Sequence, residues 1–232
     1  PDAFSGCYCV LALLEALYHR SHTGEGQHIE VAMTEALATL LPEAIMEYTL
    51  DGTEPGRVGN RHKEKAPHNV FRCQGEENWV AISVENDSQF LALAQASGNL
   101  GWSDDPRFAT PEARLKHQDE LEPLVQQWTA GLQVQEVVEK LQNAEVPAGP
   151  VLDSGQVLSD PHMIERGFVQ SPDHPEVGPR PLGAFPWAVD GGQPGIARGA
   201  PLFGEHNVKV LQELLQVPED EFARLVANGV IS

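Results

Sequence analysis

Several kinds of residue are scarce in this chain of 232 residues, and each shortage narrows what the protein can be. The 3 cysteines are odd in number and form no Cys-x-x-Cys pair, so neither a disulfide framework nor a metal site of the zinc type is indicated. No apolar run reaches the roughly 20 residues that cross a bilayer, and no charged-then-apolar leader precedes Asp2. The chain also lacks an initiator Met. We therefore expect a cytoplasmic protein with no membrane partner, or a piece of one whose beginning is missing.

Basic residues are scarce as well. Lys and Arg number 15 against 34 Asp and Glu, which gives a formal net charge of −19. This balance argues against nucleic acid as a partner, because phosphate contacts need clustered cations. No Gly-x-Gly-x-x-Gly or Gly-x₄-Gly-Lys-[Ser/Thr] segment occurs, so the sequence indicates no nucleotide-phosphate loop.

The first segment of the chain, in contrast, is rich in large apolar residues. From about residue 5 to residue 20, large apolar side chains recur at helical spacing, which predicts a buried or nearly buried helix. Asp2 or Ser5 can cap its start, and Arg20 falls in the last turn, where a cation is favoured. Residues 23–26 then end the helix, and 27–32 are expected to form a strand. A carboxylate would thus stand at the positive end of a buried helix, and Cys7 and Cys9 would pack in the core.

The remaining elements follow from the same reasoning about periodicity, caps and turns. The sequence predicts a helix at 33–50 that Pro42 either kinks or splits, and a hairpin of strands at 70–73 and 79–84. A helix at 87–97 would be capped by Asp87 or Ser88. Further elements are expected as helices at 112–130 and 134–143, an extended segment at 146–151, short helical turns at 154–164, extended chain at 167–195 with Leu182 and 184–186 as buried points, and helices at 208–215 and 218–228.

The order of several short motifs resembles that of the class III CoA-transferases, a group that includes formyl-CoA transferase, carnitine CoA-transferase and α-methylacyl-CoA racemase. Asp2 with Gly6 opens an Ala/Leu-rich helix that ends in Arg20 and Thr23-Gly24-Glu25-Gly26-Gln27. The further motifs in family order are 58–62 (Val-Gly-Asn-Arg-His), 66–68 (Ala-Pro-His), 79–82 (Trp-Val-Ala-Ile), Asn86-Asp87, 146–151 (Val-Pro-Ala-Gly-Pro-Val) and 204–206 (Gly-Glu-His). The resemblance spans essentially the whole chain.

This resemblance implies an α/β fold of the interlocked-dimer type. Residues 1–57 would be the C-terminal part of a Rossmann-like large domain, whose N-terminal half, with most of the nucleotide-phosphate contacts, is absent here. Residues 58–185 would form a small α+β domain. Residues 186–232 would be a long return linker with C-terminal helices that pack on the large domain. The implied partner is a second copy of the chain.

The resemblance also implies a chemistry. Asp2 matches the catalytic nucleophile, which would move CoA between an acyl-CoA thioester and a free carboxylic acid through an aspartyl anhydride and an aspartyl thioester. Coenzyme A would be a co-substrate, with no cofactor bound tightly. The loop with Gly59, Asn60 and His62 matches the loop that reaches the catalytic Asp, and Glu85 matches an acidic position near the racemase pocket.

Two other interpretations stay open at this point. In the first, the protein is a 2-methylacyl-CoA racemase or epimerase, and Asp2 acts as a general base. In the second, it is a truncated, non-catalytic fragment that oligomerises, because half of a Rossmann sheet exposes edges that demand a partner. Two residues also have simpler interpretations of their own: Asp2 only caps a helix, and Glu85 is a surface charge beside one.

Overall fold

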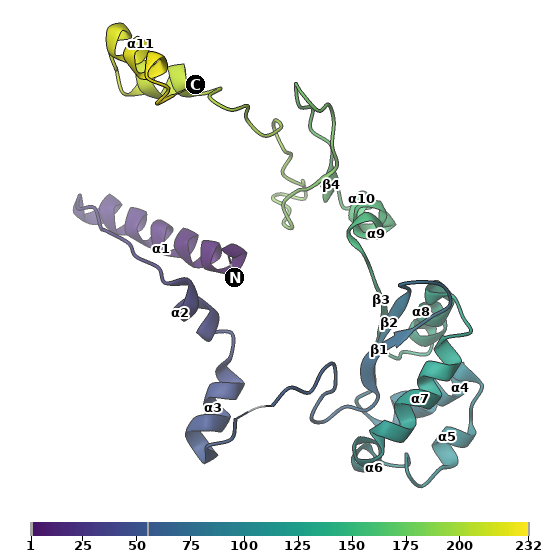
Figure 1. Ribbon diagram of the computed structural model, residues 1–232. Helices are drawn as coiled ribbons and strands as arrows, with labels where there is room; N and C mark the ends of the chain where they lie inside the picture. Colours follow the sequence, from purple (N-terminus) through teal and green to yellow (C-terminus); the bar gives the residue numbers. More distant parts are fainter. Residues whose placement is uncertain (1, 55, 232) are drawn as a thin grey trace. The chain divides into compact units, whose positions relative to one another are not determined.

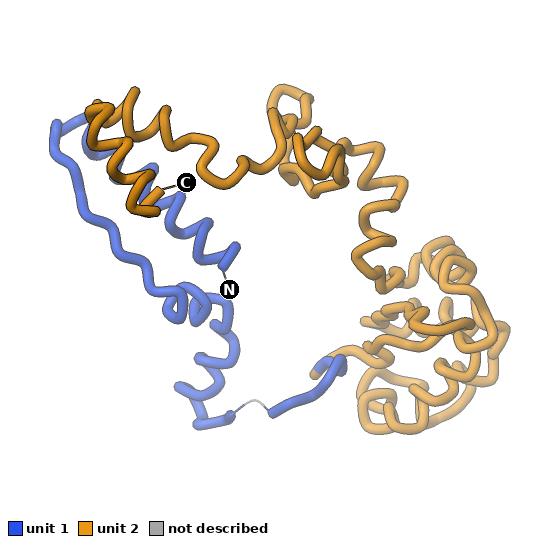
Figure 2. The backbone as a smooth tube through the Cα atoms, turned by 45° about the horizontal axis from the view of Figure 1, so that its top comes forward, with its two compact units in different colours: residues 1–62 blue, residues 63–232 orange. Residues whose placement is uncertain are grey.

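The computed structural model describes residues 2–54 and 56–231, and the chain divides into two units, residues 1–62 and 63–232 (Figure 2). The secondary structure is mixed α/β, with many helices and small sheets. The division into domains at 57 and 185, the Rossmann-like large domain and the interlocked dimer remain predictions.

The described residues of the first unit form three helices: α1 (Asp2–Thr23), α2 (Met33–Ala38) and α3 (Pro42–Asp51) (Figure 1). Helix α1 extends beyond the predicted bounds at both ends. The helix ends at Gly24, whose N–H donates to the carbonyl of Arg20 at 2.9 Å and whose φ of +81° is a conformation that glycine adopts readily. The hydroxyls of Tyr8 and Thr39 share a hydrogen bond of 2.9 Å, which ties α1 to the end of α2.

The prediction that α1 is buried is wrong for this chain. Ser5 is its only buried residue among those described, whereas its large apolar side chains lie open to solvent. The exposed fraction is 64% for Leu11, 58% for Leu14 and 68% for Tyr18. Cys7 and Cys9 are exposed too, against the expectation of core packing. Apolar periodicity identifies a surface suited to burial, but no second layer covers that surface among the described residues of this unit.

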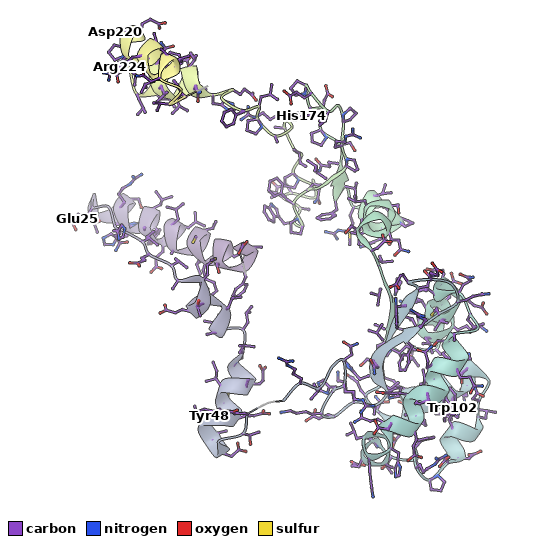
Figure 3. The ribbon with its side chains drawn as sticks, viewed as in Figure 1. Glu25, Tyr48, Trp102, His174, Asp220 and Arg224 are labelled. Carbon is purple, nitrogen blue, oxygen red and sulfur yellow. The ribbon has the colours of Figure 1, made fainter. Side chains whose placement is uncertain are left out.

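The strand predicted at 27–32 does not form: the described chain from Gly24 to Ala32 has no regular secondary structure. A strand needs a neighbour to share its ladder of hydrogen bonds, and the described residues of the first unit form no strand at all. The helix predicted at 33–50 is split in two, as the sequence allowed, because Pro42 begins α3 at a position where its missing N–H costs nothing. Figure 3 labels Tyr48 on α3, which is 58% exposed.

The second unit is built on an antiparallel sheet of three strands, in the order β1 (His68–Arg72), β2 (Trp79–Ser83), β3 (Ala148–Val151). The predicted hairpin is confirmed: Phe71 pairs with Val80 and Arg72 with Trp79. On the central strand Val80 and Ile82 are buried and Ala81 is exposed, the period-2 pattern of a sheet with one covered face. The extended segment predicted around 146–151 supplies the third strand.

Five helices connect the second and third strands: α4 (Asp87–Ser97), α5 (Gly101–Asp104), α6 (Pro111–Lys116), α7 (Gln118–Thr129) and α8 (Val134–Asn143). Apolar residues of the sheet, α4, α7 and α8 form one buried cluster, and Trp102, labelled in Figure 3, packs against it. Leu121 and Val125 on α7 and Val137 and Leu141 on α8 are fully buried.

Two local predictions in this unit need correction. The N-cap of α4 is Asn86, not Asp87 or Ser88, because the Asn86 side chain accepts a hydrogen bond of 2.9 Å from the Gln89 N–H. The single helix predicted at 112–130 is two helices, because the backbone of His117 (φ −108°, ψ 23°) leaves the helical region between them.

The rest of the chain contains short elements: α9 (Ser154–Ser159), α10 (Pro161–Glu165), the paired strands β4 (Val169–Gln170) and β5 (Leu182–Gly183), the π-helix η1 (Val208–Leu214) and α11 (Glu219–Ala227). Leu182 and Phe185, predicted as buried points, are 45% and 42% exposed. Strands of two residues enclose little volume, so these side chains gain little cover. None of the helices in the described part of the chain is both long and apolar enough to cross a bilayer.

Candidate functional site

Asp2 lies in the first turn of α1, a helix of 22 residues, and its side chain is exposed. The prediction of a carboxylate at the positive end of this helix is therefore confirmed. Free N–H groups and the helix dipole favour an anion there, typically by 0.3–1 kcal/mol. The shielding of Asp2 from water that a buried helix would give is not present in this chain.

One turn further along α1, Ser5 is 4% exposed and its hydroxyl has no hydrogen-bond partner among the described residues. The next residue, Gly6, has open space where a side chain would begin, since an added Cβ would meet nothing within 4 Å. The start of α1 thus combines an exposed carboxylate, an unpaired buried hydroxyl and a bare stretch of main chain.

Two shallow hollows lie along α1 within the first unit. One, of about 260 Å³, lies between Tyr8 and Ala12 on α1 and Ala36 and Thr39 at α2. The other, of about 330 Å³, lies between Glu15 on α1 and the returning segment at 27–30. Asp2 lines neither of them, so neither is assigned to the candidate nucleophile.

The three loop residues predicted to bind substrate, Gly59, Asn60 and His62, are all exposed. Gly59 and Asn60 are the central residues of a tight turn, in which the Arg61 N–H donates to the Val58 carbonyl at 3.2 Å. Gly59 has a φ of +64°, a conformation that glycine adopts without steric cost at this position of a turn. The turn therefore explains the glycine, and it presents Asn60 at its tip.

Glu85, the fourth predicted substrate-binding residue, lies in the second unit, just before the Asn86 cap of α4. Its carboxylate forms an ion pair with Lys65, and its N–H donates a hydrogen bond of 2.8 Å to the Gln89 side-chain oxygen. Glu85 is therefore held beside the loop residue Lys65, and its side chain is 51% exposed.

Sequence reasoning missed the most heavily bonded polar residue near this loop. Arg114, on α6, is 1% exposed. Its Nε donates to the Ala66 carbonyl at 3.2 Å, its Nη1 to the Phe108 carbonyl at 3.0 Å and its Nη2 to Asp87 Oδ1 at 2.9 Å. The guanidinium also lies 4.6 Å from the ring centre of Phe90. A buried charge on a short helix leaves no periodic signal, and its partners are distant in sequence, so no pattern could reveal it.

The clearest pKa shifts occur away from these residues. Hydrogen bonds from Arg107 hold the pKa of the Asp105 carboxyl below its usual value, and hydrogen bonds from His117 and Arg107 do the same for the pKa of Glu120. Burial raises the pKa of the Cys73 thiol, which keeps it protonated and unreactive. Across the described ranges, 2–54 and 56–231, no three His, Cys, Asp or Glu side chains gather as metal ligands would.

Comparison with known proteins decides the family. Residues 1–207 match the model of CoA-transferase family III, which is most of the chain. The chain belongs to the family III CoA-transferases. The resemblance drawn from Asp2, the 58–62 turn and the later motifs is thereby confirmed.

Among curated relatives, this family III chain is 33% identical to the succinyl-CoA–D-citramalate CoA-transferase of Chloroflexus aurantiacus, over 99% of the chain and 57% of the relative. It is 31% identical to the formyl-CoA:oxalate CoA-transferase of Streptomyces avermitilis, over 99% of the chain and 59% of the relative. A solved CAIB/BAIF family protein from Brucella suis is 29% identical and superposes with a TM-score of 0.80, over 91% of this chain and 54% of that one. The chain thus spans little more than half the length of these relatives.

Proposed function

We propose that this family III protein moves CoA from an acyl-CoA thioester to a free carboxylic acid, with Asp2 as the nucleophile. The observation that carries the proposal is the position of Asp2, in the first turn of α1 at the head of the family match. The named relatives support transfer over epimerisation, because succinyl-CoA, formyl-CoA, oxalate and D-citramalate are thioesters and carboxylates. Coenzyme A would act as co-substrate, with no cofactor held between turnovers.

The proposed reaction proceeds in four attacks. A carboxylate oxygen of Asp2 attacks the acyl carbon of the thioester and the C–S bond breaks. CoA leaves as a thiolate, and an acyl-aspartyl anhydride forms on the protein. The thiolate attacks the aspartyl carbonyl carbon, which breaks the anhydride C–O bond, releases the donor's carboxylate and leaves an aspartyl thioester. The acceptor carboxylate attacks this thioester and expels the thiolate again. The thiolate finally attacks the acceptor's acyl carbon, which gives the new acyl-CoA and frees Asp2.

Each attack creates an oxyanion, and oxyanions need N–H donors. The unpaired N–H groups of the first turn of α1 are the nearest supply, and the lack of any side chain at Gly6 leaves the main chain there open to a substrate. In the proposal, the turn at Gly59 and Asn60, with His62, contacts the acyl-CoA, and Glu85 borders the same loop through Lys65.

A carboxylate in bulk water is a weak nucleophile, because hydration stabilises it. Asp2 is exposed in the chain as described, so the proposed cover is supplied on binding, by the acyl-CoA itself and by a second copy of the chain. The exposed apolar side chains of α1, Leu11 and Leu14 among them, are the surface that such a copy would cover.

Trapping with hydroxylamine tests the proposal. The protein is incubated with succinyl-CoA and hydroxylamine, and peptides are mapped by mass spectrometry for a hydroxamate. We expect the modification on Asp2 and its loss in Asp2→Asn. Glu43→Gln is the matched control, because Glu43 is likewise an exposed carboxylate in the first turn of a helix, α3, and its variant should be trapped as the wild type is.

A hydroxamate elsewhere, or turnover that survives in Asp2→Asn, would exclude Asp2 as the nucleophile. Exchange of the α-proton of a 2-methylacyl-CoA with deuterated water, in the absence of trapping, would instead assign the epimerase reaction.

A further inference from the structure

Residues 65–67 follow the candidate substrate loop, residues 58–62, in the chain, and each of the three is bonded to another residue of the second unit, to which they belong. Lys65 forms the ion pair with Glu85. The Ala66 carbonyl accepts the hydrogen bond of 3.2 Å from Arg114 Nε. The Pro67 carbonyl accepts a hydrogen bond of 2.9 Å from the Val84 N–H. Three successive residues of this connection are therefore fixed by three separate partners.

Arg114 is the rigid member of this group. Its side chain is 2% exposed, and all three of its nitrogens donate, each to an acceptor in a different segment. The planar guanidinium cannot satisfy these acceptors in another orientation. An apolar side chain of similar volume would fill the same space but leave the Ala66 and Phe108 carbonyls without their donor. The Arg114 hydrogen bonds therefore hold several main-chain segments in fixed positions. The segment that contains Ala66 is the one that follows the candidate substrate loop.

We propose that Arg114 is a positioning residue for substrate binding: with the Lys65–Glu85 ion pair, it clamps residues 65–67 and so holds the loop that carries Gly59, Asn60 and His62 in its substrate-binding form. The inference rests on the proposed function, because the loop is assigned to acyl-CoA binding there. The new element is that residues 65–67, which follow this loop in the chain, are fixed. The protein would then bind substrate with a preformed loop instead of one that becomes ordered on binding.

A preformed loop has a kinetic signature. If the clamp is weakened, only a fraction of molecules carries the loop in its binding form, and the apparent affinity falls by that fraction, while the attack by Asp2 is unaffected. We expect Lys65→Met to raise KM for succinyl-CoA about tenfold, with kcat within about twofold of wild type. Lys140→Met is the matched control, because it removes a similarly exposed ion pair, with Glu136 on α8, and should leave both constants unchanged.

Arg114 is buried, so its loss also weakens the fold, and the test uses two variants. Arg114→Met removes all three donors. We expect Arg114→Met to raise KM for succinyl-CoA. Arg114→Lys retains the charge and one or two of the bonds, and we expect it to reverse part of that rise in KM when the two variants are compared at matched thermal stability. Tryptic cleavage after Arg61 and Lys63, followed in native protein, provides a readout without turnover. We expect Lys65→Met to be cut faster there than Lys140→Met.

The outcomes separate this inference from the proposed function. Absence of a hydroxamate on Asp2 in wild type at saturating succinyl-CoA defeats the proposed function. If wild type is trapped at Asp2 but KM and cleavage rate in Lys65→Met match those of Lys140→Met, the clamp alone is overturned. A fall in kcat that only tracks thermal stability across the Arg114 variants would overturn it as well.

Discussion

Arg114 Nη2 and Asp87 Oδ1 lie 2.9 Å apart, yet the two ends of this ion pair have opposite surroundings: the Arg114 side chain is 2% exposed and that of Asp87 is 63% exposed. Truncation of the two residues should therefore have unequal cost. Arg114→Met leaves the Ala66 and Phe108 carbonyls without their donor, and we expect a loss of about 3 kcal/mol in the free energy of unfolding.

Asp87→Asn should cost only about 1 kcal/mol, because an amide oxygen still accepts from Arg114. The charge interactions that it removes, with Arg114 and with the start of α4, are screened by water at the largely exposed Asp87. Urea unfolding of both variants measures the difference. Equal losses would show that the guanidinium is bound chiefly by Asp87 and not by the two carbonyls.

The cap of α4 supplies a second prediction. Asn86 Oδ1 accepts hydrogen bonds from the Gln89 N–H and the Ser88 hydroxyl. Asn86→Ala should lower the free energy of unfolding by about 1 kcal/mol, since it leaves an N–H of the first turn unpaired. Ser88→Ala, two residues further along the chain, should lower the free energy of unfolding by only a few tenths of a kcal/mol, on the order of 0.3 kcal/mol. A larger loss in Ser88→Ala than in Asn86→Ala, measured by thermal melts, would place the cap at Ser88, one of the two positions that the sequence predicted.

Acid stability should depend on Arg107. Its hydrogen bonds lower the pKa of Asp105 and help to lower that of Glu120 in the folded chain. A carboxyl whose pKa is lower when folded adds stability above its unfolded pKa, and loses it as the pH falls through the folded pKa. The melting temperature should therefore fall below about pH 5, and Arg107→Gln should make that fall shallower.

The matched control for Arg107 is Arg224→Gln, which removes an exposed arginine paired with Glu221 on α11, outside this network. Its melting temperature should follow the wild-type pH dependence. Scanning calorimetry from neutral pH to pH 3 compares the three proteins. Parallel curves for Arg107→Gln and wild type would mean that Arg107 does not set the acid limb.

Ser5 gives a prediction of the opposite sign. Its hydroxyl is buried without a hydrogen-bond partner among the described residues, so its removal should relieve a cost. We expect Ser5→Ala to raise the free energy of unfolding by about 1 kcal/mol. Ser21→Ala, also on α1, removes an exposed hydroxyl that donates to the Tyr18 carbonyl, and should be nearly neutral. A loss of stability in Ser5→Ala would show that the hydroxyl is paired in solution.

Local pattern predicted much of the second unit. The hairpin follows from alternation at Val80 to Ile82, and α8 from the spacing of Val137, Val138 and Leu141, because each element packs its apolar side against the same cluster. Pattern also placed Asp2 at the start of α1. These are properties of residues close together in the chain, and a single sequence displays them.

What pattern could not predict depends on partners far away in the chain. Leu11 and Leu14 have the spacing of a buried helix, but whether they are covered depends on what packs against α1, and the described residues leave them open. Arg114 and Ala66 are 48 positions apart, and nothing local marks either one. The cap of α4 was missed by one residue, because Asn86, Asp87 and Ser88 can all accept from a first-turn N–H, and only geometry selects among them.

Loop 57–65 carries Arg57, Arg61, Lys63 and Lys65 within nine residues of a chain whose formal charge is −19. Such a stretch attracts polyanions locally, and added salt weakens that attraction. If the protein binds acyl-CoA as proposed, that binding should consequently slow as ionic strength rises, even though the chain and acyl-CoA carry net charges of the same sign.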